Sequence, residues 1–238
     1  MSSNVPFRLR IGELVGRSFE VYLANLAPFL LLSAIVFVPG MLVTYAALSS
    51  GADNAPTLVL VAGILTALAG QLLTGALTYA VVQKLRGEPA PVAEVLSIGV
   101  RSLLRVLLVG IVTGVCIGIG MIFLIVPGMI LMTWFYVAVP AAVVERIGLD
   151  AMGRSRTLSE GSRWQIFGAV LLLVLASAGL NWLLTQMTEG MGMAGLLLQF
   201  AVEVALGPLG ATMAATCYFM LRVGKENVDA SKLAAVFD

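Results

Sequence analysis

Glu203 is the residue with the strongest chemical implication, because it is a carboxylate inside a long apolar stretch. Residues 195–221 around it contain no other charged side chain. An ionised side chain at membrane depth costs several kcal/mol, so it should face the interior of a helix bundle. Asn181 lies at a similar depth on another apolar stretch, Gln199 precedes Glu203 by one helical turn, and Gln71 lies near the middle of a third stretch. These four residues form a candidate intramembrane polar site that would bind a proton or a cation.

Glu203 also has a simpler interpretation, as a packing residue that is protonated at neutral pH because burial disfavours its charged form. A pump or symporter is better supported by a chain of ionisable groups, and no such chain accompanies Glu203. We expect Glu203 to be buried in the bundle and hydrogen-bonded at the depth of Asn181. A cavity that reaches Glu203 from one side would favour the transport interpretation.

The residue patterns of enzymes are missing from this sequence. It contains no histidine, no P-loop, no dinucleotide fingerprint and no cluster of metal ligands, so catalysis has little to rest on. We therefore predict a protein that is not an enzyme and has no cofactor or metal. Nucleic-acid binding is equally unsupported, since acidic residues dilute the basic ones.

The composition shows what must position these residues. Hydrophobic residues make up 60% of the chain and charged residues 11%, far below the roughly 25% charged residues of soluble proteins. A bilayer core needs about 20 apolar residues in helical form. We predict an all-α polytopic membrane protein, a single membrane domain over 1–238, with short amphipathic interfacial helices on the cytoplasmic side. The six predicted transmembrane helices cover residues 26–48, 57–82, 106–123, 127–144, 164–186 and 195–221.

The placement of charge predicts the orientation of these helices. With six spans, all 14 basic residues fall in the two terminal segments and the alternate connections, whereas the other loops hold only Asp53 and Glu189. Lys and Arg in short loops stay on the cytoplasmic side. We expect a multi-pass protein of the bacterial inner membrane with both termini in the cytoplasm.

Proline and glycine predict where the helices are interrupted. Residues 106–144 contain no charge and are too long for a single crossing. A proline cannot continue the helical hydrogen bonds and a glycine permits a tight reversal, so a proline-glycine pair should supply the turn. Broken helices near the midplane also occur in transporters. The predicted helix breaks are Pro39, Gly40, Pro127, Gly128, Gly207 and Pro208.

Three amphipathic segments precede the odd-numbered spans, at residues 11–23, 92–105 and 149–160. Each has an apolar face and a basic face, as expected for helices that lie in the membrane interface with arginines toward anionic lipid. The alternative is that they are connectors covering the cytoplasmic end of the bundle. The predicted lipid-headgroup contacts are Arg17, Arg101, Arg105, Arg154, Arg156 and Arg163.

Several short motifs between residues 106 and 175 resemble a known family. They are Leu124-Ile125-Val126-Pro127-Gly128, Ala138-Val139-Pro140, Ala151 through Arg154-Ser155, Leu158, Gly161, Trp164 and Phe167-Gly168. These motifs look like the bacterial six-helix family related to the membrane domain attached to some glycerophosphoryl diester phosphodiesterases. The resemblance implies an inner-membrane protein associated with lipid or envelope physiology. It does not imply the phosphodiesterase reaction, which needs an additional soluble domain with histidine and carboxylates.

Two functions follow from these observations. The leading hypothesis is a non-catalytic scaffold or regulator in envelope and lipid homeostasis, which rests on the resemblance and on the arginine-bearing segments. The competing hypothesis is a small transporter with an intramembrane site around Glu203. The expected partners are membrane lipids, with anionic phospholipid the candidate, and a membrane protein or a second copy of the chain.

Overall fold

A computed structural model describes residues 9–49, 55–88 and 91–226 of the chain. Arg8, Asp53 and Lys232, which the orientation argument uses, lie outside these ranges. Within them all regular secondary structure is helical and no strand occurs, which confirms the all-α class. The helices are α1 (Ile11–Ala24), α2 (Leu26–Ser49), α3 (Ala55–Leu85), α4 (Val92–Phe123), α5 (Ile125–Phe135), α6 (Ala138–Val144), α7 (Asp150–Ser159), α8 (Arg163–Thr188) and α9 (Met193–Glu226).

Six helical segments of the described chain are long and apolar enough to cross a membrane, so the protein is a polytopic membrane protein. Their lengths follow from apolar runs in which helix formation is the only way to satisfy the backbone in lipid. The segments are Leu26–Ser49, Pro56–Leu85, Ala93–Phe123, Val126–Val144, Arg163–Thr188 and Met193–Glu226.

Two of these segments differ from the prediction in where the helix is continuous and where it is interrupted. Residues 92–105, predicted as a separate interfacial helix, and the span 106–123 form one continuous helix, α4. No proline interrupts this segment, and the hydroxyl of Ser102 donates to the carbonyl of Ile98 at 2.8 Å, within the same helix. The span 127–144 is instead divided into α5 and α6 by a turn at Tyr136 and Val137.

The prolines predicted as helix breaks do not end helices. Pro39 lies inside α2 and Pro208 inside α9, and both helices continue past them. Pro127 is the third residue of α5, in the first turn, where a backbone N–H has no helical partner to lose. The reversal before it occurs at Leu124, whose extended backbone ends α4 and begins α5.

The neighbouring glycines serve close helix packing instead of helix termination. A Cβ at Gly40 would lie 2.7 Å from Thr66 Oγ1 of α3, and one at Gly207 would lie 2.5 Å from the ring of Phe37 on α2. A Cβ at Gly128 would approach the backbone nitrogen of Met121 on α4 to 2.8 Å. Because heavy atoms do not approach this closely, a side chain would separate the helices at each of these positions.

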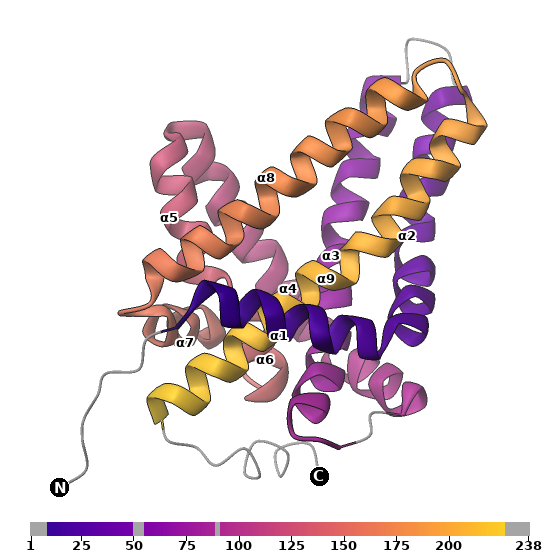
Figure 1. The fold of residues 1–238 in the computed structure, drawn as a ribbon. Helices are drawn as coiled ribbons and strands as arrows, with labels where there is room; N and C mark the ends of the chain where they lie inside the picture. Colours follow the sequence, from indigo (N-terminus) through magenta and orange to yellow (C-terminus); the bar gives the residue numbers. More distant parts are fainter. Residues whose placement is uncertain (1–8, 50–54, 89–90, 227–238) are drawn as a thin grey trace, which may run out of the picture.

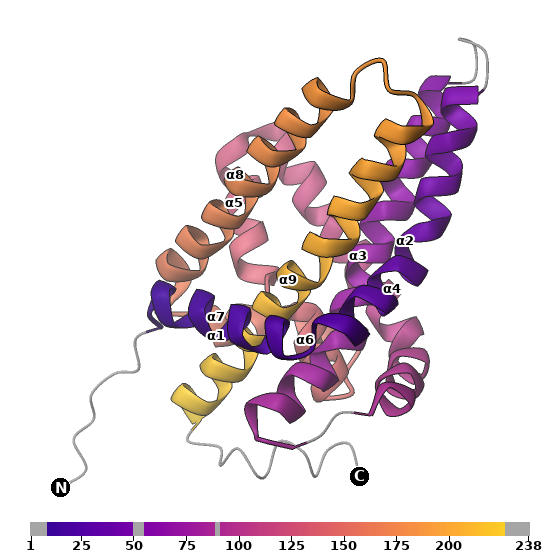
Figure 2. The same ribbon diagram turned by 45° about the vertical axis from the view of Figure 1, so that its right-hand side comes forward.

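The helices that carry most of the predicted headgroup arginines gather at one end of the molecule. In Figures 1 and 2, α1, α6, α7 and the last turns of α9 gather at one end, and α1 lies crosswise to α2 and α3 there. The end of α2, the start of α3 and the turn between α8 and α9 lie at the opposite end. The arginines of α1, α7 and the start of α8 therefore share one end, as the orientation argument requires.

The apolar face of α1 is covered by protein. Leu14, Val21 and Tyr22 are buried, and the helix packs against α9. This contact supports the connector interpretation for that face. Phe19 and Leu23 remain exposed on α1, so the predicted contact of the helix with lipid would use these residues.

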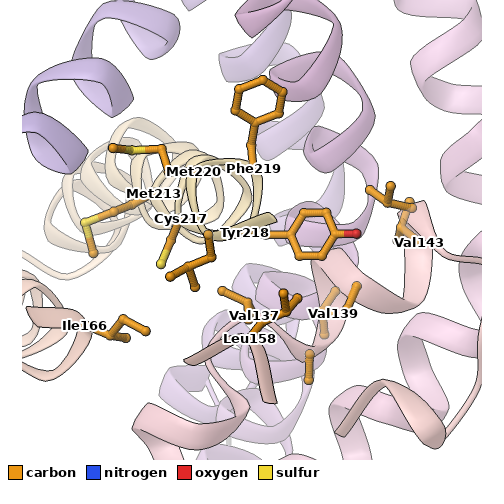
Figure 3. Close-up of a cluster of buried hydrophobic side chains, with 14 of the residues drawn as sticks. Val137, Val139, Val143, Leu158, Ile166, Met213, Cys217, Tyr218, Phe219 and Met220 are labelled. Atoms are coloured by element: carbon orange, nitrogen blue, oxygen red, sulfur yellow. The ribbon is translucent and has the colours of Figure 1, made fainter. Parts of the chain in front are cut away.

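Two buried hydrophobic clusters hold the helices together, one where α6, α7 and α9 meet and one among α1, α2, α3 and α9. Figure 3 shows the first cluster, in which the ring of Tyr218 points from α9 toward Val143 of α6. Cys217 is fully buried in it and, like Cys116, is a free thiol. Close van der Waals packing of these side chains holds the helices together at this end of the bundle.

Candidate functional site

The four residues predicted to form an intramembrane polar site line a single cavity. Glu203 and Gln199 come from α9, Asn181 from α8 and Gln71 from α3. The cavity has a volume of about 470 Å³, within the range typical of small-molecule sites. We call it the Glu203 cavity. Its wall also contains the aromatic ring of Phe37, the hydroxyl residues Thr66, Thr74 and Ser177, and the apolar residues Leu173 and Leu206.

The expected hydrogen bond of Glu203 is not formed. The side chain is partly buried, and it makes no hydrogen bond or ion pair with any residue in the described ranges. Gln199 instead donates to the hydroxyl of Thr188 at 2.6 Å, and Asn181 donates to the carbonyl of Ser177 at 2.9 Å. The amides are used by neighbours on their own helical hairpin, so the carboxylate faces the cavity without a protein partner.

A second cavity lies beside the turn that joins α8 and α9. This loop-side cavity has a volume of about 570 Å³ and is lined by Thr44 of α2, by Thr185 and Glu189, and by the start of α9. Gln199 lines both cavities. Thr188, to which Gln199 donates its hydrogen bond, lines the loop-side cavity only, so Gln199 is the residue shared by the two walls.

Local packing positions the segment of α9 that carries Glu203. Gly207, one turn after it, allows Phe37 to approach the helix backbone. The hydroxyl of Tyr22 donates to the carbonyl of Ala205 at 2.7 Å, from α1. Pro208 has no N–H for the carbonyl four residues earlier, so Tyr22 adds a hydrogen bond beside the weakened turn. Burial raises the pKa of Tyr22, which keeps its hydroxyl a donor.

The arginines predicted to contact lipid headgroups divide into different environments. Arg17 forms an ion pair with Glu13 at 3.0 Å on the surface of α1, as their i,i+4 spacing favours. Arg101 is exposed and Arg105 partly exposed on α4. These three side chains remain compatible with contact to headgroups.

Arg154 lies instead in a network of charges at the end of the bundle. Its Nε donates to Glu145 Oε1 and Oε2 at 2.8 and 2.9 Å, and its Nη2 lies 2.5 Å from Glu226 Oε1. Burial alone would lower the pKa of Arg154, but the hydrogen bonds and charges of the two glutamates outweigh it and raise the pKa. The guanidinium is thus held by protein carboxylates, which corrects its assignment as a lipid contact.

Two residues of α9 complete this network. Tyr218 donates to Glu145 Oε1 at 2.9 Å, and Arg222 Nη1 donates to the Tyr218 hydroxyl at 2.7 Å. Arg222 Nε also lies 3.5 Å from Glu226 Oε2. The sequence offered a weak signal for this group, because Glu145 and Glu226 are acids among basic residues just outside apolar spans.

Arg156 and Arg163 have an aromatic partner in place of an acid. Their guanidinium carbons lie 4.5 and 5.1 Å from the ring centroid of Trp134, within the range of cation–π attraction. Neither forms an ion pair with an acid in the described part of the chain. Trp134 thereby joins α5 to α7 and to the first residue of α8.

Comparison with known proteins supports a bacterial membrane family. The chain is 31% identical over 129 residues to a UPF0259 membrane protein of Sodalis glossinidius. The aligned region covers 53% of this chain and 52% of that protein. The chain thus spans about half the length of the curated relative that it matches. No family model matches the chain, and no solved structure matches it. This likeness is to a membrane protein, and it carries no link to the membrane domains of glycerophosphoryl diester phosphodiesterases.

Proposed function

We propose that this protein is a small, non-catalytic transporter whose substrate site is the Glu203 cavity. The observation that carries the proposal is that Glu203, Asn181, Gln199 and Gln71, from three different helices, line one cavity in which the carboxylate has no protein partner. The substrate class that fits is a small organic cation with apolar groups. Glu203 supplies the opposite charge and Phe37 an aromatic face.

The unpaired carboxylate is the strongest support for a ligand. A charged group inside a membrane protein is costly unless it is paired, hydrogen-bonded or neutralised by a proton. A bound cation would provide that pairing, and the amide and hydroxyl groups on the same wall would orient it. The loop-side cavity shares Gln199 with this site, and we propose it as the route by which the substrate enters.

A scaffold or regulator in envelope and lipid homeostasis is the second candidate. The family resemblance of residues 106–175 and the similarity to a UPF0259 membrane protein are compatible with it. The observation that favours it is the pair Arg156 and Arg163, which carry positive charge without an acidic partner in the described chain. In this case Glu203 is a packing residue, protonated within the bundle.

Binding of ethidium, a fluorescent organic cation, separates the two candidates. In detergent-purified protein, we expect saturable binding by fluorescence polarisation that weakens about tenfold to a hundredfold in Glu203→Gln, because one charge-assisted contact is lost. Glu189→Gln, which removes an acid of the loop-side cavity only, is the matched control. In proteoliposomes, the same Glu203→Gln variant should fold normally and lose ethidium uptake. Equal binding by wild type and Glu203→Gln would rule out the transport proposal and leave the packing role.

A further inference from the structure

An apolar groove lies between α5 and α8. Its α5 side is a stripe along Val126–Trp134 with members three or four residues apart, and its α8 side is Arg163, Trp164 and Phe167. The groove has a volume of about 440 Å³. The stripe extends about 12 Å along α5 at 1.5 Å per residue, which is most of one leaflet of a hydrocarbon core about 30 Å thick. We call this feature the α5–α8 groove.

Positive charge is concentrated at one end of the α5–α8 groove. Arg163 lines it, and Arg156 stacks on Trp134, which also lines it. Two guanidinium groups on one indole ring repel each other unless an anion lies between or beside them. The first turn of α8 starts at this point, and its N-cap residue Ser162 makes no side-chain cap. Its free backbone N–H groups add positive potential there.

A buried donor at this end also lacks a partner. The Nε of Arg163, a residue that lines the groove, is buried and forms no hydrogen bond within the described ranges. Buried donors without partners are costly, and an acceptor oxygen would satisfy them. The two guanidinium groups and the start of α8 thus lie at one end of an apolar groove. A phospholipid has the matching order, with a phosphate at one end of an acyl chain.

We propose that the α5–α8 groove binds one anionic phospholipid, with its phosphate at Arg156 and Arg163 and an acyl chain along α5. The helix α7 and the start of α8, which carry these arginines, lie at the end of the molecule that also holds α1 and the last turns of α9 (Figure 1), where the headgroup layer is expected. Trp164, which lines the groove and is 82% exposed, suits the same interfacial level. A zwitterionic lipid fits less well, because its ammonium group would meet the two guanidinium groups.

Native mass spectrometry of the full chain with phosphatidylglycerol or phosphatidylcholine tests the site. We expect wild-type protein to retain phosphatidylglycerol in preference to phosphatidylcholine. The Arg156→Gln, Arg163→Gln double variant should retain it about thirtyfold less, the product of two contacts of ordinary headgroup strength. The Arg10→Gln, Lys84→Gln double variant is the matched control, because it removes two exposed basic residues that lie outside the groove and are not predicted headgroup contacts, and it should retain wild-type binding.

A groove-filling variant keeps the test decisive if loss of the arginines prevents folding. Ile130→Trp leaves both arginines in place and fills the apolar stripe, so it should lose retained phosphatidylglycerol while binding of free inorganic phosphate is unchanged. Loss of lipid in the Arg10→Gln, Lys84→Gln control to the same extent would show that only net charge matters and would overturn the site. Unchanged retention in Ile130→Trp would overturn it as well, and so would equal retention of the two lipids by the wild type.

Discussion

Arg154 and Glu145 form an ion pair in which the single Nε–H of Arg154 is shared by both carboxylate oxygens of Glu145, at 2.8 and 2.9 Å. The pair connects α7 to the end of α6, and Glu226 brings in the end of α9. The side chains of Arg154 and Glu145 are only 25% and 17% exposed, so water screens their charges weakly. The network therefore joins three segments that approach one another only in the folded bundle.

Removing Arg154 should destabilise this end of the protein. Arg154→Ala leaves Glu145 and Glu226 partly buried without their main partner, and we expect the free energy of unfolding to fall by about 1.5–3 kcal/mol. Thermal unfolding of the detergent-purified protein measures the change. Arg101→Ala, an exposed arginine of α4, should change stability by less than about 0.5 kcal/mol. Equal effects of the two substitutions would contradict a structural role for the ion pair.

The hydrogen bond between α1 and α9 should contribute to stability on its own. Tyr22→Phe removes only the hydroxyl that donates to the Ala205 carbonyl, so it should lower the free energy of unfolding by about 1 kcal/mol. The matched control is Tyr45→Phe, at an exposed tyrosine of α2, which should be neutral. A neutral Tyr22→Phe would mean that α1 is held to α9 by apolar contacts alone.

Glycines in the α4–α5 hairpin should differ sharply in their tolerance of a methyl group. Gly128→Ala places a Cβ against the backbone of Met121, and we expect a loss of about 1–3 kcal/mol from overpacking. Gly114→Ala on α4 meets no atom within 4 Å, and it should stabilise the helix by about 0.5–1 kcal/mol. Chemical unfolding of both variants in one detergent measures the contrast. A destabilised Gly114→Ala would indicate that another chain packs on α4.

The orientation in the membrane can be measured with single cysteines. In a background of Cys116→Ser and Cys217→Ala, a cysteine at Glu189 should react with an impermeant thiol reagent added from the periplasm. A cysteine at Lys84, in the last turn of α3 at the other end of the molecule, should react only after the membrane is opened. Labelling of the Lys84 position from the periplasm would overturn the predicted orientation.

Local features of the sequence were sufficient to predict the class of protein and the members of the polar cavity. Hydropathy sums over about 20 neighbouring residues, and the burial cost of a charge depends mainly on its depth within its own span. Glu203, Gln199 and Asn181 could therefore be grouped by depth before any packing was known. The bounds of α2 and α8 also lie within two residues of the predicted spans.

Only the tertiary structure decided which neighbour each side chain meets. Gly40, Gly128 and Gly207 each adjoin a proline, the sequence pattern of a helix break, yet each allows two helices to pack closely. Arg154 has the sequence setting of a lipid contact, yet Glu145 and Glu226 hold it. Such roles depend on distances between residues that are far apart in the chain. The residue pattern within one helix contains no information about these distances. The depth of a residue in the membrane follows from the segment that contains it, whereas the side chain that contacts it is determined by how the helices pack.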